Sequence, residues 1–259
     1  MQNVSHFIAQ IGRSTIEQLI GMGRMFIFLL SAFAWAMRPP QRLRLIIFHI
    51  RTIGVESLSV VLLSGIFTGM VMGLQGYYSL RKFNAESFLG SAAAIGLLRE
   101  LGPVLSAFMV TGRTGSAMAA EIGSMKVTEQ IDALYSMAVN PVQYLVSPRI
   151  IAGLISMPLL TAIFDVVGLY GAYLVGVKLL GVSSGSFIAG MEGSTVYNDF
   201  LSGLLKSISF GLIITWVCCY KGFQAPPRAT GVGQATTESV VLCFVLILVW
   251  DYFMTSVML

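Results

Sequence analysis

Ionisable residues interrupt the apolar stretches of this chain at four sites, and their side chains are the ones most able to do chemistry there. Arg99 and Glu100 are adjacent, Asp165 and Lys206 each stand alone among aliphatic and small residues, and Asp251 lies near the end of the last stretch. An ionised side chain in hydrocarbon surroundings is costly, so each one requires a partner or a ligand. These residues therefore predict either buried ion pairs or a polar cavity that receives a charged group.

The two alternatives place the same residues in different roles. In the first, Glu100 or Asp165 pairs with Lys206 and only locks the helices together. In the second, the charges line a cavity that receives a charged headgroup. Pro103 follows Glu100 by three residues and removes one helix hydrogen bond, which permits a bend beside the charged pair. Asp251 stands between two aromatic residues, and we interpret it as an interfacial anchor.

Catalytic and metal-binding patterns are missing from the sequence. Its two histidines, His6 and His49, lie near the amino terminus, and neither an H-E-x-x-H motif nor a Cys/His cluster occurs. No nucleophile is paired with a base inside the apolar stretches. The sequence also lacks a G-x-x-x-x-G-K-[ST] phosphate loop. We therefore expect no enzyme activity, no catalytic residue, no metal and no cofactor on this chain.

The composition requires a lipid environment. Of the 259 residues, 56% are hydrophobic and only 11% are charged, and the mean hydropathy is +0.81. A soluble domain carries about 25% charged residues, so a water-facing surface cannot be built from this chain. The net charge of +4 is explained by membrane topology, and we expect no nucleic-acid partner.

The apolar stretches predict an all-α integral membrane protein. A spanning helix needs about 20 mostly apolar residues, and five stretches qualify. An amphipathic helix at 4–37 is predicted to lie in the membrane interface, since its apolar run is short and two prolines follow. Residues 42–51 continue it as a basic elbow. This gives an interfacial unit at 1–52 and a five-span unit at 53–259, with spans at 55–79, 88–112, 149–177, 199–220 and 237–258.

The distribution of basic residues predicts the orientation. Eleven Lys and Arg residues fall on the side of the amino terminus and three on the other, so the amino terminus is expected in the cytoplasm and the carboxyl terminus outside. At 1.5 Å per residue, Arg99 and Glu100 lie about 17 Å, and Lys206 about 10 Å, below the outer boundary. Asp165 lies about 24 Å above the cytoplasmic one. The charges therefore gather toward the outer half of the membrane.

Two further patterns predict contacts. Gly65, Gly69 and Gly73 form a flat stripe on the first span, which suits close packing either inside the bundle or against a second copy of the chain. The loop between the second and third spans has apolar residues at helical spacing over 117–137. This short amphipathic helix would either dock on a soluble partner or rest on the bilayer surface.

Several segments resemble the MlaE (YrbE-like) family of ABC transporter permeases. They are GIFTGMVMGLQGYYSL, LLRELGPV, GRTGSAMAAEIGSMKVTEQIDAL, MAVNP, SPRIIAGLISMPLLT, LLKSISFG and GVGQATTESVV, and the match extends over about residues 50–250. The resemblance implies a homodimer of five-span subunits in the inner membrane of Gram-negative bacteria. It also implies four partners: an MlaF-like ATPase that uses ATP and Mg, an MlaB-like STAS protein, an external MlaD-like ring of MCE domains, and a glycerophospholipid substrate. Its role would be to maintain outer-membrane lipid asymmetry.

The resemblance also implies roles for individual residues. Arg99, Glu100 and Lys206 match charged positions of the family's lipid cavity, and the region 120–140 matches its ATPase-contacting helix. An ion-coupled secondary transporter, with Glu100 or Asp165 as proton site, and a non-transporting scaffold remain as alternatives. Four cavity-wall residues follow by extension along the neighbouring helical faces, and four coupling residues lie in the loop helix: Met72, Leu80, Phe83 and Leu101, and then Glu121, Glu129, Asp132 and Leu134.

Overall fold

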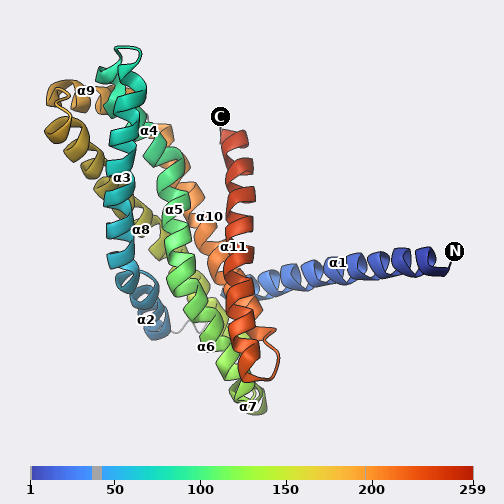
Figure 1. Cartoon of the computed structure of the whole chain (residues 1–259). Coiled ribbons are helices and arrows are strands. Elements are labelled where there is room, and N and C mark those ends of the chain that lie inside the picture. Colours follow the sequence, from blue (N-terminus) through green and yellow to red (C-terminus); the bar gives the residue numbers. More distant parts are fainter. Residues whose placement is uncertain (1, 37–42, 196, 259) are drawn as a thin grey trace.

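A computed structural model describes residues 2–36, 43–195 and 197–258 of the chain, with side chains from Ile16 onward except those of residues 17 and 18. Every regular element in these ranges is helical. Long helices lie side by side along one direction, and α1 leaves the bundle across it (Figure 1). The bounds are α1 Gln2–Ala36, α2 Leu43–Ile53, α3 Leu58–Arg81, α4 Leu89–Gly96, α5 Gly102–Val110, α6 Ser116–Val127, α7 Gln130–Ser136, α8 Ser147–Tyr173, α9 Ser184–Ser194, α10 Tyr197–Phe223 and α11 Ala229–Met258.

The predicted spans are confirmed by length and composition. Six stretches of the described residues are long and apolar enough to cross a membrane. Five of them contain the predicted spans and extend beyond them. The sixth, Leu19–Ala36, belongs to α1. The spanning stretches are Leu43–Arg81, Glu86–Val127, Val142–Leu179, Tyr197–Phe223 and Ala229–Met258.

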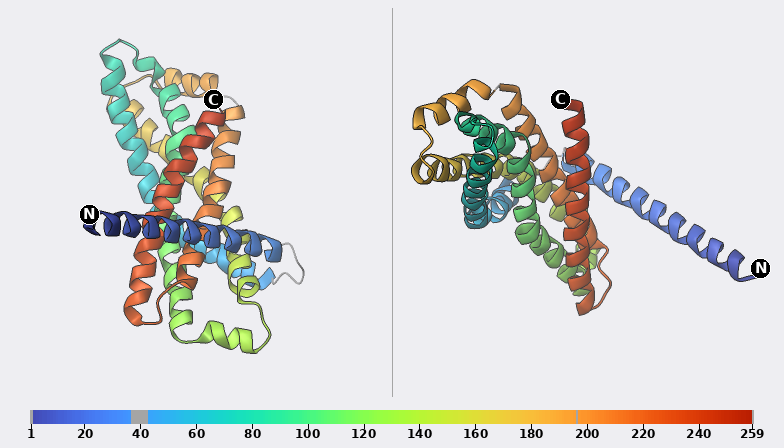
Figure 2. Two further views of the ribbon diagram at one scale, coloured as in Figure 1. Left: turned by 90° about the vertical axis from the view of Figure 1, so that its right-hand side faces the viewer. Right: turned by 45° about the horizontal axis from the view of Figure 1, so that its top comes forward.

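Helix α1 leaves the bundle, and its place in the membrane interface stays a prediction, because its stretch Leu19–Ala36 is also long and apolar enough to span. It runs across the bundle direction in both views of Figure 2, and only 6% of its apolar window is buried. Its second half holds to α10, where Trp216 donates a 2.9 Å hydrogen bond to the carbonyl of Met25 and the ring of Phe28 lies 5.5 Å from that of Tyr220. The prolines expected to end this segment, Pro39 and Pro40, lie outside the described residues.

The segment predicted as a basic elbow forms α2, and one face of this helix is buried against the bundle. Within α2, Ile46, His49 and Ile53 are buried, and the helix packs against α8. Its exposed face carries apolar residues such as Ile47 and Phe48. One face of α2 therefore joins the bundle while the other is left to the lipid. The division of the chain at residue 52 stays a prediction.

The glycine stripe of α3 packs against α8 of the same chain. A side-chain carbon added at Gly69 would lie in severe overlap with the carbonyl of Gly168, and one at Gly73 would lie 2.9 Å from the carbonyl of Ala172. The two backbones can approach this closely because Gly69 and Gly168 face each other and Gly73 faces the small Ala172. The homodimer alternative is therefore wrong for this stripe.

The long loop between the second and third spans differs from its prediction. Helix α6 is a continuation of α5 through a π-helical turn at Thr111–Gly115, so the second span runs on without a break to Val127. The chain then turns at Glu129, whose φ of 58° cannot continue a right-handed helix. A separate, short α7 follows. The predicted helix at 117–137 is thus two elements with different directions, and α7 and α9 mark opposite ends of the bundle (Figure 1).

Candidate functional site

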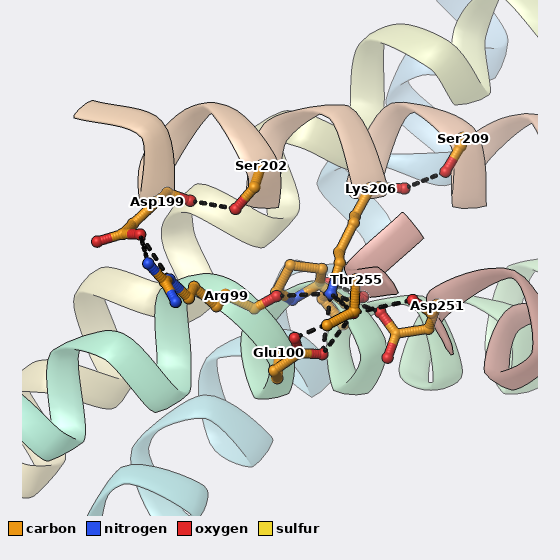
Figure 3. A network of polar contacts seen from close by, with 10 residues as sticks. Arg99, Glu100, Asp199, Ser202, Lys206, Ser209, Asp251 and Thr255 are labelled. Atoms are coloured by element: carbon orange, nitrogen blue, oxygen red, sulfur yellow. Dashed lines mark hydrogen bonds and ion pairs between the residues drawn. The ribbon is translucent and has the colours of Figure 1, made fainter. Parts of the chain in front are cut away.

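Lys206 of α10 is the centre of a buried polar network near the α9 end of the bundle (Figure 3). Its side chain is only 2% exposed. Its Nζ lies 2.9 Å from a carboxylate oxygen of Glu100 and 2.9 Å from one of Asp251. The same atom lies 2.7 Å from the hydroxyl of Thr255 and donates a 3.0 Å hydrogen bond to the carbonyl of Arg99. Helices α10 and α11 and the second span are therefore joined through one ammonium group.

Local helix geometry makes the Arg99 carbonyl available. Residues Leu97–Leu101 form a π-helical turn, and Pro103 lies four residues after Arg99. Proline has no N–H, so the α-helical donor for the Arg99 carbonyl is missing. Lys206 supplies a donor in its place. π-helical turns occur often at functional sites, and here the turn carries both charged residues of the second span.

Arg99 is held by Asp199, at the start of α10. Its Nε donates a 2.5 Å hydrogen bond to Oδ1 of Asp199, and Nη2 lies 2.5 Å from the same oxygen. The Asp199 side chain is 3% exposed, whereas that of Arg99 is 39% exposed. Sequence analysis missed Asp199. The signal for it is its place seven residues before Lys206, which puts both on one face of α10.

These side chains surround a pocket of about 80 Å³. It opens between the second span, α10 and the last turn of α11. Within the part of the chain that the structure describes, the charged network contains two cations and three carboxylates, since Asp251 lies behind the lining and contacts Lys206. The lining residues are Arg99, Glu100, Asn198, Asp199, Ser202, Lys206, Thr255 and Met258.

A larger and mainly apolar groove, of about 370 Å³, lies between α3 and the second span. Met72 and Leu101, two of the four predicted cavity-wall residues, line this groove, and their contact with lipid stays a prediction. Glu100 lines the charged pocket and Leu101, the next residue, lines the groove. Consecutive residues of the π-helical turn therefore face the two cavities. The groove is lined by Phe67, Thr68, Val71, Met72, Gln75 and Leu101.

The other two predicted wall residues lie elsewhere. Leu80 packs into a cluster at the α9 end together with Leu89 and Phe187. Phe83 is 79% exposed, because α3 ends at Arg81 and carries Phe83 past the helix into the following turn. The prediction that both residues continue the cavity-lining face of α3 is therefore not supported. Leu80 faces a neighbouring helix, and Phe83 lies beyond the end of α3.

Asp165 does not pair with Lys206. It lies beside a cavity of about 10 Å³ next to Thr161 and Ser207, and its Oδ1 has no hydrogen-bond partner among the described residues. Asp251, and not Asp165, contacts Lys206 in addition to Glu100. The side chain of Asp251 is 17% exposed and lies against Lys206, so its description as only an interfacial anchor is wrong.

The predicted coupling residues lie in α7 or close to it in the chain, at the other end of the bundle. Glu129 is exposed, Leu134 is partly buried against the bundle, and Asp132 makes a 3.5 Å contact with Lys126. Glu121 lies 2.7 Å from Arg149 of α8, whose side chain is 2% exposed. Arg149 also donates a 2.6 Å hydrogen bond to the carbonyl of Leu145. Sequence analysis counted Arg149 only as a topology marker, and the structure makes it the buried link at the base of the α7 loop.

The helices and the buried charges define a multi-span membrane protein with a polar site inside its bundle, the arrangement of a transport permease. Among the described residues, no group of three His, Cys, Asp or Glu side chains is placed to hold a metal ion. The family model for "Permease MlaE" matches residues 46–257. This chain belongs to the MlaE permease family.

Similar proteins cover nearly the whole chain. The intermembrane phospholipid transport system permease protein MlaE of Haemophilus influenzae is 41% identical over 256 residues, which is 98% of both chains. A probable ABC transporter permease protein of Rickettsia bellii is 43% identical and covers 95% of both. A probable ABC transporter permease protein of Synechocystis is 37% identical over 80% of this chain and 78% of its own.

Proposed function

We propose that this chain is the membrane-spanning subunit of an ABC transporter that moves glycerophospholipids between the inner membrane and periplasmic carriers, and so maintains outer-membrane lipid asymmetry. The observation that carries the proposal is the junction at Glu100 and Leu101, where a charged pocket and an apolar groove lie on either side of one helical turn. A phospholipid has the same two parts, a charged headgroup and apolar chains. The name of the Haemophilus relative supports phospholipid transport, and the name of the Rickettsia relative supports an ABC transporter permease.

The partners proposed for the chain are those that its resemblance to the MlaE family implies. The sequence contains no phosphate loop, so ATP and Mg would be used by a separate MlaF-like ATPase that docks around α7 and residues Glu121, Glu129, Asp132 and Leu134. An MlaB-like protein would accompany it in the cytoplasm, and an MlaD-like ring would receive lipid at the α9 end. This arrangement places the amino terminus in the cytoplasm and the carboxyl terminus in the periplasm.

A homodimer is proposed from the size of the groove. Pockets for drug-sized ligands measure about 300–1,000 Å³, and the groove of about 370 Å³ is at the low end of that range although a phospholipid carries two long chains. A second copy of the chain, placed over the open side of the groove, would enlarge the cavity. The glycine stripe of α3 takes no part in that contact, since α8 covers it.

Mass spectrometry of lipids bound to the purified complex, with and without a trapped ATP state, tests the proposal. A transporter retains phospholipid, and the amount changes between the two states. Replacement of Glu100, Lys206 and Asp251 together by Met separates transport from structure. A scaffold tolerates the triple replacement, because apolar residues often replace a buried ionic network without loss of stability. A lipid permease stays folded and loses transport, and normal transport by this variant would refute the role of the charged pocket.

A further inference from the structure

The charges of the pocket differ sharply in how far they are open to a ligand. The side chains of Lys206 and Asp199 are 2% and 3% exposed, and that of Asp251 is 17% exposed. Those of Arg99 and Glu100 are 39% and 40% exposed. A molecule that enters the pocket therefore meets Arg99 and Glu100 as the most exposed charges, while Lys206 and Asp199 line the pocket with little exposed surface and Asp251 lies behind the lining.

Both open groups keep hydrogen-bonding capacity. Arg99 uses Nε and Nη2 for Asp199, and the Nη1 donors have no partner among the described residues. Glu100 accepts from Lys206 at Oε2 and from Thr255 at Oε1, at 2.9 and 3.1 Å. Each carboxylate oxygen accepts two hydrogen bonds, so further donors can be accommodated. The buried partners fix both side chains in place, which lowers the ordering cost of binding.

The charge of the whole network points in the same direction. Among the described residues, two cations stand against three carboxylates, which leaves one negative charge in excess. A lipid with only a phosphate adds a second negative charge to this partly buried region. A lipid whose phosphate is followed by an ammonium group adds none, and its two charges match the two open side chains in sign.

We infer that the pocket selects zwitterionic phospholipids, with the phosphate at Arg99 and the ammonium at Glu100, over phospholipids with an anionic headgroup. This inference rests on the proposed function, because it assumes that phospholipid is the cargo. It adds a specificity-determining role for Glu100. Asp199 would then hold Arg99 in place for the phosphate, and Asp251 would share the charge of Lys206 with Glu100. Lys206 alone cannot balance both Glu100 and Asp251, so a negative charge remains for the headgroup amine.

The test uses the intact transport complex in bilayers that contain equal amounts of phosphatidylethanolamine and phosphatidylglycerol. The lipids that remain bound after purification are counted by mass spectrometry. An ion pair at a partly exposed site corresponds to roughly a two- to fivefold preference. We expect the wild-type complex to be enriched in phosphatidylethanolamine by this factor and Glu100→Gln to lose the enrichment. Lys206 keeps Asp251 as its partner in that variant, so the bundle remains joined.

Glu86→Gln is the matched control. Glu86 is a partly exposed carboxylate at the same end of the bundle, paired with Arg81 at 3.8 Å and absent from the pocket, so this variant keeps the wild-type ratio. A second measurement needs no variant: an N-acylated phosphatidylethanolamine keeps the phosphate but lacks the ammonium, and it must lose the enrichment. Bound lipid in the bilayer ratio, or enrichment that survives Glu100→Gln or N-acylation, overturns the inference. A complex without any phospholipid overturns the proposed function instead.

Discussion

The Nζ of Lys206 donates a 3.0 Å hydrogen bond to the main-chain oxygen of Arg99. This contact joins a side chain of α10 to the backbone of the second span at the position where Pro103 removes the α-helical donor. A lysine buried at 2% exposure needs acceptors for all its protons. The carbonyl of Arg99, which Pro103 leaves without a backbone donor, therefore provides an acceptor for the buried ammonium group of Lys206. In turn, Lys206 satisfies the hydrogen-bonding capacity of that carbonyl.

Replacement of Pro103 by Ala tests this relationship. The new N–H competes with Lys206 for the freed carbonyls of the π-helical turn, and a helix interior generally tolerates Ala better than Pro by about 3 kcal/mol. We expect thermal stability to be kept or raised, while lipid transport falls because Lys206 and Glu100 are displaced. Transport assays and thermal unfolding of the purified complex measure the two effects separately. Wild-type transport by a folded Pro103→Ala variant would show that the turn is only structural.

Replacement of Asp165 by Asn separates this residue from the polar network. Its Oδ1 has no partner among the described residues, and Lys206 is occupied by Glu100 and Asp251. An unsatisfied buried polar group costs about 1–3 kcal/mol, so a neutral side chain of the same shape should leave the free energy of unfolding unchanged or raise it. We expect transport to stay at the wild-type level. A folded Asp165→Asn variant without transport would give Asp165 the functional role that its position does not support.

The sequence predicted the elements because its signals are local. Five apolar stretches and one amphipathic segment follow from composition alone, and all five stretches lie within helices long enough to span. The choice of Arg99, Glu100 and Lys206 follows from the cost of a charge in lipid, and the structure brings the three together. Their role in binding lipid stays a prediction.

Partner choice could not be predicted, because it depends on how helices far apart in the sequence are placed. Asp165 and Asp251 both lie inside apolar stretches, and only the packing of α11 beside α10 decides that Asp251 reaches Lys206. Asp199 was hidden because it stands at the edge of its span, where a charge needs no explanation. The break at Glu129 is equally invisible, since a positive φ in a residue other than glycine leaves no pattern in the sequence.

Two glycines in spanning helices should respond very differently to Ala. A side-chain carbon at Gly69 overlaps the carbonyl of Gly168, and neither backbone can move without separating α3 from α8. We expect Gly69→Ala to lower the free energy of unfolding by about 1–3 kcal/mol or more. Gly112 has no atom within 4 Å of the added carbon, so Gly112→Ala is the control and should be neutral or slightly stabilising. Thermal unfolding of the purified complex compares them, and equal effects would contradict the packing of α3 on α8.

The ion pair between the buried Arg149 and the exposed Glu121 closes the base of the loop that carries α7. Arg149 is 2% exposed, but the Glu121 side chain is 55% exposed, so Arg149→Met leaves no buried charge behind. We expect this variant to fold and to loosen the position of α7 against α6 and α8. If α7 receives the ATPase as proposed, the amount of lipid moved per ATP hydrolysed should fall severalfold while ATP hydrolysis continues.

Lys126→Met provides the comparison on the same loop. Its 3.5 Å contact with Asp132 joins two side chains that are 35% and 58% exposed, and such pairs contribute at most about 1 kcal/mol. The ratio of lipid moved to ATP hydrolysed should therefore stay at the wild-type value, since the loop base remains closed by Arg149. The ratio is measured with the reconstituted complex, by lipid transfer and phosphate release in the same sample. An equal ratio in the Arg149→Met and Lys126→Met variants would mean that the pair of Arg149 and Glu121 holds the helices together without positioning α7.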